Sequence, residues 1–128
     1  ILNKLNRWQV ECKMINITFV CFGNNFYEFH SEGHAEFNKG NDIVCAGVSA
    51  LSYALLGTLE NVKGLKVKNE IKNGKMFIGI DAATKDVHAI ANTVFSTICI
   101  GLKQLQLTYP DHVKVDILSD ATMTEESR

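Results

Sequence analysis

The pair Asn73–Gly74 constrains the fold of this chain more than any other short feature. It separates two alternating segments, LKVKNEI (65–71) and KMFIGI (75–80). Asparagine and glycine tolerate the positive φ angles of a tight turn, so this pair is typical of a two-residue β-hairpin. A similar signal, GNN at 23–25, lies between the alternating segment MINITFVCF (14–22) and FYEFH (26–30). The sequence therefore predicts two antiparallel hairpins.

A long helix is predicted after each hairpin. Residues 43–62 are apolar on most sides and follow Asp42, a residue type that often caps a helix, so we expect a largely buried helix there. A fifth strand is predicted at 112–118, and the order ββαββαβ indicates an α+β fold, a mostly antiparallel sheet packed with two helices. The second helix is predicted from apolar residues at spacings of three and four that end before Tyr109: Val87, Ile90, Ala91, Val94, Ile98, Leu102 and Leu105.

The length and the charge of the chain fit one domain. A chain of 128 residues buries about two-thirds of its unfolded surface. We expect the domain at 14–120, an N-terminal extension at 1–13 and a flexible tail at 121–128.

The formal net charge of −1 gives no basic surface for direct nucleic-acid binding. No uninterrupted apolar run reaches the roughly 18 residues of a membrane helix, so no membrane contact and a cytoplasmic location are expected.

Most of the cysteines and histidines are expected to have structural roles. The spacing of Cys12, Cys21, Cys45 and Cys99 contains no CxxC pair and predicts reduced thiols, with Cys21 and Cys99 acting as small hydrophobic residues. The segment HSEGHAE (30–36) is rich in potential ligands, but it lacks the HExxH pattern of a zinc helix. We therefore expect no metal and no cofactor. His88 and His112 begin a predicted helix and strand, where surface or capping roles are expected.

Cys45 differs from the other cysteines because it lies at the start of a predicted helix. Unpaired backbone N–H groups and the helix dipole favour a thiolate at this place. Lowering the pKa of a thiol by two units requires about 2.7 kcal/mol, whereas a helix end supplies about 0.3–1 kcal/mol. A cationic partner is therefore needed, and His34, in the polar loop before the helix, can supply it as an imidazolium.

The same helix start offers donors for a developing oxyanion, namely the N–H groups of Cys45 and Ala46. Asp42 has two interpretations: a plain helix cap, which we favour, or a carboxylate that orients His34. A cysteine and a histidine near a loop–helix junction are common. Their spacing alone therefore leaves structural roles open for both.

The segment GHAEFNKGNDIVCAGVSALSYAL (33–55) resembles the signature of the ribosomal-processing cysteine protease (Prp) family. It contains Gly-His-Ala, Gly-x-Asp-Ile-Val-Cys-Ala and Val-Ser-x-Leu at the spacings of that family, and the similarity extends from about Met14 to Leu118. The resemblance implies a bacterial, homodimeric cysteine endopeptidase. It would remove the N-terminal extension of a large-subunit ribosomal protein of the L27 type by cutting after an aromatic apolar segment, with Cys45 as the nucleophile and His34 as the base.

The resemblance also suggests roles for neighbouring residues. Ser49 matches a serine of the family, and either contacts substrate or bonds back to its own helix. Gly33 and Gly40 bracket the loop as hinges, and Phe37 is a large apolar residue there without a core pattern, so we expect it to contact substrate. A non-catalytic ribosome-assembly or protein-binding module on the same scaffold is the alternative function.

Overall fold

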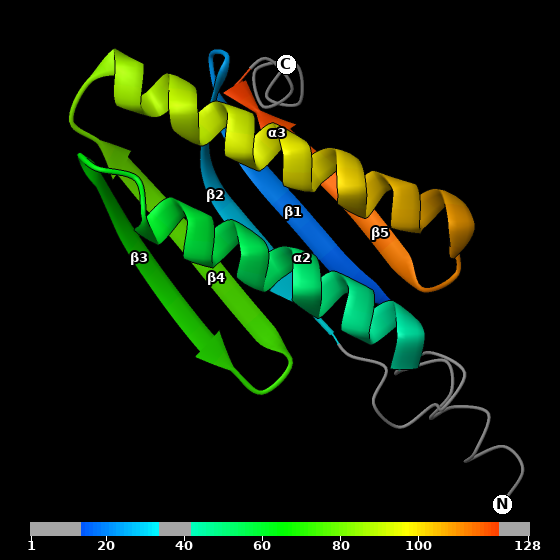
Figure 1. Cartoon of the computed structure of the whole chain (residues 1–128). Coiled ribbons are helices and arrows are strands. Elements are labelled where there is room, and N and C mark those ends of the chain that lie inside the picture. Colours follow the sequence, from blue (N-terminus) through cyan, green and yellow to red (C-terminus); the bar gives the residue numbers. More distant parts are fainter. Residues whose placement is uncertain (1–13, 34–41, 121–128) are drawn as a thin grey trace, which may run out of the picture.

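The structure is a computed structural model that describes residues 14–33 and 42–120. Interpretations that fall on residues 1–13, 34–41 and 121–128 lie outside the described residues. The elements follow the order ββαββαβ (Figure 1), which confirms the predicted fold class. They are β1 (Ile15–Phe22), β2 (Asn25–Glu32), α2 (Asp42–Glu60), β3 (Leu65–Lys72), β4 (Lys75–Ala82), α3 (Lys85–Thr108) and β5 (Val113–Ser119).

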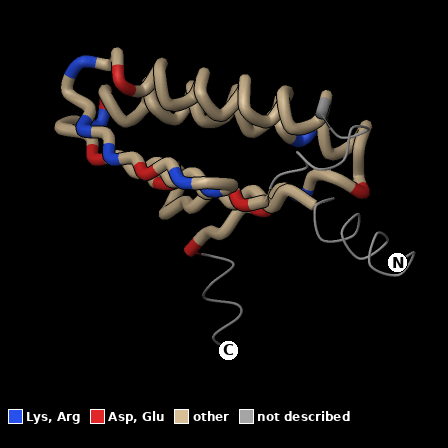
Figure 2. Tube along the Cα trace, turned by 90° about the horizontal axis from the view of Figure 1, so that it is seen from below, with Lys and Arg blue, Asp and Glu red and all other residues tan. Residues whose placement is uncertain are grey.

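The five strands form one sheet in the order β3-β4-β2-β1-β5. The pairs β1–β2, β2–β4 and β3–β4 are antiparallel, and β5 joins β1 in parallel. Both helices cover the same face of the sheet, as Figures 1 and 2 show from two directions. The described part of the protein therefore has two layers, and the second face of the sheet carries no helix.

Both predicted hairpins are present, and each uses a glycine where the backbone requires one. Gly23 (φ 61°) lies in the β1–β2 turn and Gly74 (φ 75°) in the β3–β4 turn. Positive φ is costly for residues with a Cβ but not for glycine. The β1–β2 register shifts between Val20 and Cys21, and this bulge leaves Tyr27 without a register partner.

The core lies between the sheet and the helices. Ile15, Ile17 and Phe19 alternate along β1 and are fully buried, and the ring of Phe19 contacts Phe29 and Phe95 edge to face. The predicted α3 stripe is correct at most positions. Ile90 is the exception: it is 52% exposed, because Ala91 on the next position supplies the buried contact.

His88 corrects another prediction. It is 8% exposed rather than on the surface, and its Nε2 lies 2.8 Å from the carbonyl oxygen of Phe26. One helical turn later, Asn92 accepts a hydrogen bond from the Phe26 N–H at 2.8 Å. The start of α3 thus satisfies both backbone groups of Phe26, next to the β1–β2 bulge. Buried polar groups of this kind cost free energy when left unpaired.

The described cysteines, Cys21, Cys45 and Cys99, are free thiols. Cys21 and Cys99 are buried, which confirms their predicted role as small hydrophobic residues. Burial raises the pKa of the Cys21 thiol, as do the nearby Cys99 and Asp120, and burial likewise raises the pKa of the Cys99 thiol. Both thiols therefore stay protonated and unreactive near neutral pH.

Helix α2 is apolar along most of its length, as the sequence predicts. The window Ile43–Glu60 is long and apolar enough to cross a membrane by length and composition, with a mean hydropathy of 1.6. The window contains Ser49, Ser52 and Thr58, so it is not an uninterrupted apolar run. In the structure, Val44, Leu55 and Leu59 of this helix are fully buried against the core, and 33% of the window is buried.

Candidate active site

Cys45 lies in the first turns of α2, as predicted, and its side chain is partly buried. It lines a groove of about 170 Å³ between α2, the end of β2 and the tip of the β3–β4 hairpin. The burial of Val44 and Val48 fixes the rotation of the helix, and this rotation directs Cys45 to the groove. The lining residues are Ile15, Ser31, Gly33, Cys45, Val48, Ser49, Ser52, Tyr53, Ile71, Lys72, Gly74, Lys75 and Met76.

Helix α2 begins at Asp42, which agrees with the predicted start to within the usual latitude of helix ends. With this start, the N–H groups without an intrahelical acceptor are those up to Val44. The N–H of Ala46 instead lies in reach of the Asp42 carbonyl by the i to i−4 pattern. The side chain of Asp42 is outside the described residues. Its capping or orienting role and the oxyanion role of Ala46 stay predictions.

Ser49 lies one turn after Cys45, is exposed and lines the same groove. Its hydroxyl forms no hydrogen bond to any residue that the structure describes. Ser52, the next serine of the helix, does bond back: its hydroxyl donates to the Val48 carbonyl at 2.7 Å. The back-bonded interpretation thus fits Ser52 rather than Ser49, and the Ser49 hydroxyl faces the groove without an intramolecular acceptor in the described parts.

Gly33 fixes the point at which the chain leaves β2. Its φ of 105° is unfavourable for residues with a Cβ, and a Cβ here would approach the Met14 carbonyl oxygen to 2.5 Å. Its N–H donates to the Gly74 carbonyl at 2.8 Å. Gly33 is therefore held between β1 and the β3–β4 turn, at the rim of the groove. His34 follows it directly in the sequence, but His34, Phe37 and Gly40 are outside the described residues.

Replacing Gly33 by alanine is expected to lower the free energy of unfolding by about 2–3 kcal/mol. A residue with a Cβ is less stable at positive φ by about 1 kcal/mol, and the new Cβ would also overlap the Met14 carbonyl oxygen. Urea unfolding followed by circular dichroism measures the change. Gly23→Ala is the matched control, because Gly23 also has positive φ but nothing within 4 Å of its Cβ position. Equal losses for the two variants would show that contact with Met14 does not constrain Gly33.

The tip of the β3–β4 hairpin supplies the wall that the sequence did not predict. Ile71, Lys72 and Lys75 face the groove from this tip. Lys72 pairs with Glu70 at 2.7 Å and Lys75 with Glu32 at 3.4 Å. The hydrogen bond with Glu70 raises the pKa of Lys72, and both side chains are solvent-exposed. The lysines at this rim are thus already paired with carboxylates.

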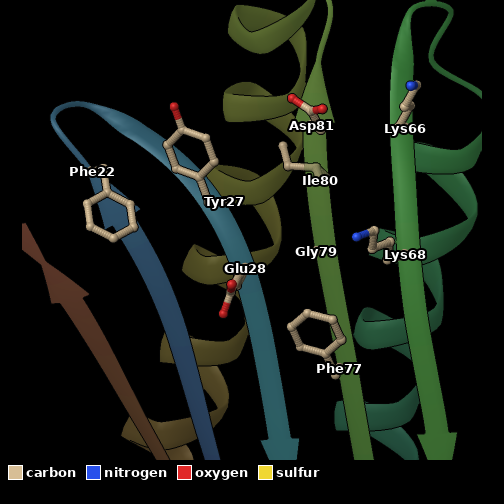
Figure 3. Close-up of a pocket in the computed structure, with 9 residues that line it drawn as sticks. All are labelled: Phe22, Tyr27, Glu28, Lys66, Lys68, Phe77, Gly79, Ile80 and Asp81. Atoms are coloured by element: carbon tan, nitrogen blue, oxygen red, sulfur yellow. The ribbon is translucent and has the colours of Figure 1, made fainter.

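A larger depression of about 600 Å³ lies on the sheet face away from the helices (Figure 3). The ring of Phe77 lies over Gly79 at its centre, and Lys66 and Lys68 of β3 face a surface that also carries Glu28 and Asp81. It contains none of the predicted site residues. Its mixed charge and lack of a cysteine make the smaller groove around Cys45 the better candidate for chemistry.

The histidines described by the structure do not form a metal site. His30 is exposed and pairs with Glu28 at 2.8 Å. Among residues 14–33 and 42–120, no three His, Cys, Asp or Glu side chains gather in a position to hold a metal ion.

Comparisons with known proteins identify the family of this chain. The family described as "Cysteine protease Prp" matches residues 14–114. The ribosomal processing cysteine protease Prp of Mycoplasma genitalium is 30% identical over 87 residues, which are 67% of this chain and 83% of that protein. The crystal structure of SMU.848 from Streptococcus mutans superposes with a TM-score of 0.72 at 27% identity, covering 84% of this chain and 97% of the other.

A second solved structure shares the fold at lower identity. Prp from S. aureus, in complex with a covalently linked product peptide, has a TM-score of 0.69 at 19% identity and covers 81% of this chain and 99% of its own. This similarity supports the two-layer architecture. The match over residues 14–114 includes the groove and the whole segment around Cys45. The chain belongs to the Prp family of ribosomal processing cysteine proteases.

Proposed function

We propose that this protein is a bacterial, cytoplasmic endopeptidase with a Cys45–His34 dyad, and that it removes the N-terminal extension of a large-subunit ribosomal protein of the L27 type. The observation that carries this proposal is the position of Cys45. It lies at the start of α2 in an open groove whose rim includes Gly33, the residue directly before His34. The S. aureus relative with a covalently linked product peptide supports a covalent mechanism.

In the proposed mechanism, His34 withdraws the proton of the Cys45 thiol, and the sulfur attacks the scissile carbonyl carbon. The carbonyl oxygen becomes an oxyanion, which free N–H groups at the start of α2 stabilise. Collapse of this intermediate breaks the C–N bond, and His34 donates its proton to the departing amine. Water then attacks the thioester with His34 as the base, which releases the carboxylate product and restores the thiol.

The test is incubation of the purified protein with the ribosomal precursor, followed by mass spectrometry of both fragments. We expect one internal cut after the aromatic apolar segment of the extension. Intact precursor bound to the protein would instead favour the non-catalytic binding module on the same scaffold.

Phe37 is proposed to contact the substrate next to the groove. Replacing it by alanine is expected to raise KM about tenfold for the precursor, since an apolar contact of this kind contributes roughly 1.4 kcal/mol. Steady-state kinetics measure the effect. Phe22→Ala is the control, because Phe22 is an exposed phenylalanine at the end of β1 that lines the other depression. Unchanged KM and kcat in Phe37→Ala would remove Phe37 from the substrate site.

We also propose that the protein is a homodimer. Helix α2 carries no charged residue between Asp42 and Glu60, yet Ile43, Ala46, Ala50 and Ala54 are exposed. Figure 2 shows the charged residues mainly along the sheet and the loops. Outer helix faces of isolated domains are usually charged, so this pattern is typical of a covered face. Sedimentation of the purified protein tests the stoichiometry.

A further inference from the structure

Two large apolar side chains are exposed to solvent on different walls of the Cys45 groove. Tyr53 of α2 is 54% exposed, and Ile71 at the end of β3 is 46% exposed. Ile15, Val48 and Met76 lie buried between these walls, together with Ser52, whose hydroxyl is bonded to the Val48 carbonyl. Single exposed apolar residues need no explanation, but several that share one groove are typical of a binding surface. Among the residues that the structure describes, neither Tyr53 nor Ile71 belongs to the buried core or to the side chains packed against it.

The charged residues at this end of the groove do not favour an acidic ligand. Among the described residues, the cations that line the groove are Lys72 and Lys75, and each has a carboxylate partner, at 2.7 and 3.4 Å. Recognition of an acidic side chain would have to displace Glu70 or Glu32. An apolar side chain meets no such competition, and its burial between Tyr53 and Ile71 removes apolar surface from water.

The helix fixes how far Tyr53 lies from the reacting sulfur. Tyr53 follows Cys45 by eight positions, and a helix rises about 1.5 Å per residue, so the two are about 12 Å apart along the axis. An extended peptide rises about 3.3 Å per residue. A substrate held extended along α2, with its scissile carbonyl at Cys45, therefore reaches Tyr53 about three or four residues from the cleaved bond.

We propose that Tyr53 and Ile71 form a specificity subsite for an apolar substrate side chain three or four residues away from the cleaved bond. The inference rests on the proposed endopeptidase activity and specifies its substrate class. The side chains next to the bond lie near Cys45 and Ser49. Selection of the cleavage site therefore depends on a second, remote anchor as well as on the residue at the cut.

The experiment uses synthetic peptides that span the cleavage site mapped in the precursor and extend beyond the fourth residue on either side. Each position is replaced by alanine in turn. With the intact protein, kcat/KM is expected to fall about tenfold for alanine at one position three or four residues from the bond. Tyr53→Ala and Ile71→Ala should cause a similar fall with the parent peptide. With a peptide that already carries alanine at the anchor position, neither variant should show a further fall in kcat/KM. The effects of two substitutions that remove the same contact are not additive.

Ile90→Ala is the matched control. Ile90 is 52% exposed, a fraction similar to those of Tyr53 and Ile71. It lies near the start of α3 and does not line the groove. Its kcat/KM should match that of the intact protein for every peptide. Binding of a fluorescently labelled parent peptide to Cys45→Ala protein, with and without Tyr53→Ala, gives a second readout that needs no cleavage.

The outcomes separate this inference from the proposed function. Cleavage that is independent of Tyr53 and Ile71, or fully additive losses, overturns the subsite and leaves the endopeptidase intact. Binding that depends on Tyr53 without any cleavage supports the subsite and overturns the endopeptidase. Failure of both cleavage and binding overturns both.

Discussion

Cys45→Ala is expected to abolish cleavage of the ribosomal precursor, with a loss of at least about 10⁴-fold in kcat, because no other group can form the covalent intermediate. Thermal stability should stay nearly unchanged, since the side chain is only partly buried at the edge of the groove. Cys45→Ser should behave in the same way, because a hydroxyl is a far weaker nucleophile. Mass spectrometry of a cleavage time course and a thermal melt measure the two effects.

Cys21→Ala is the matched control, and it should show the opposite pattern. Cys21 is buried in the sheet, away from the groove, so its truncation should leave cleavage intact and lower stability by about 1 kcal/mol. Retained cleavage in Cys45→Ala would show that Cys45 is not the nucleophile and that the dyad is wrongly assigned.

His34→Ala is expected to slow alkylation of Cys45 near neutral pH by about tenfold, because the helix end alone stabilises a thiolate too weakly. The labelling rate in this variant should recover as the pH rises. In the intact protein the rate should reach its plateau at lower pH. Iodoacetamide labelling against pH, with each cysteine mapped by mass spectrometry, measures both profiles. Cleavage should fall by at least about 10²-fold, as expected for loss of a general base.

Cys21 and Cys99 provide internal references within the same sample. Burial raises the pKa of both thiols, so they should label slowly near neutral pH and faster only as the pH rises, in the intact protein and the variant alike. Catalytic hydrogen bonds sometimes tighten only when substrate is present. The measurement is therefore repeated with a non-cleavable substrate-like peptide. Superimposable Cys45 profiles with and without His34, in both states, would remove His34 from the mechanism.

The order of the elements was predictable because its signals are local. The Asn73–Gly74 turn and the changes between periods of two and 3.6 residues need only neighbouring positions. The strand order was not predictable in the same way, because β5 joins β1 across almost the whole described chain. His88 was misjudged for a related reason. Its partner, the Phe26 carbonyl, belongs to a hairpin that the α3 sequence gives no means of locating.

The two walls of the candidate site also differed in how far the sequence could predict them. Cys45 and Ser49 were predictable because they share one face of one helix. The wall formed by Ile71 and Gly74 was not, since it depends on which strands α2 crosses. Tyr53 resembled any other apolar residue of a buried helix until the structure showed it exposed beside Ile71.

The parallel pairing of β1 with β5 also affects how this protein forms in the cell. Ile15 pairs with Val113, and the Ile15 N–H donates to the His112 carbonyl at 2.8 Å, so the strand start that borders the groove is held by β2 on one edge and by the distant β5 on the other. Contacts so distant in sequence carry a large loop-closure entropy and slow folding. Until β5 leaves the ribosome, β1 keeps an open edge in a hydrophobic sheet, which is a site for aggregation. We therefore expect the nascent chain to acquire a complete groove only after β5 has been synthesised, which delays proteolysis until that strand has paired with β1.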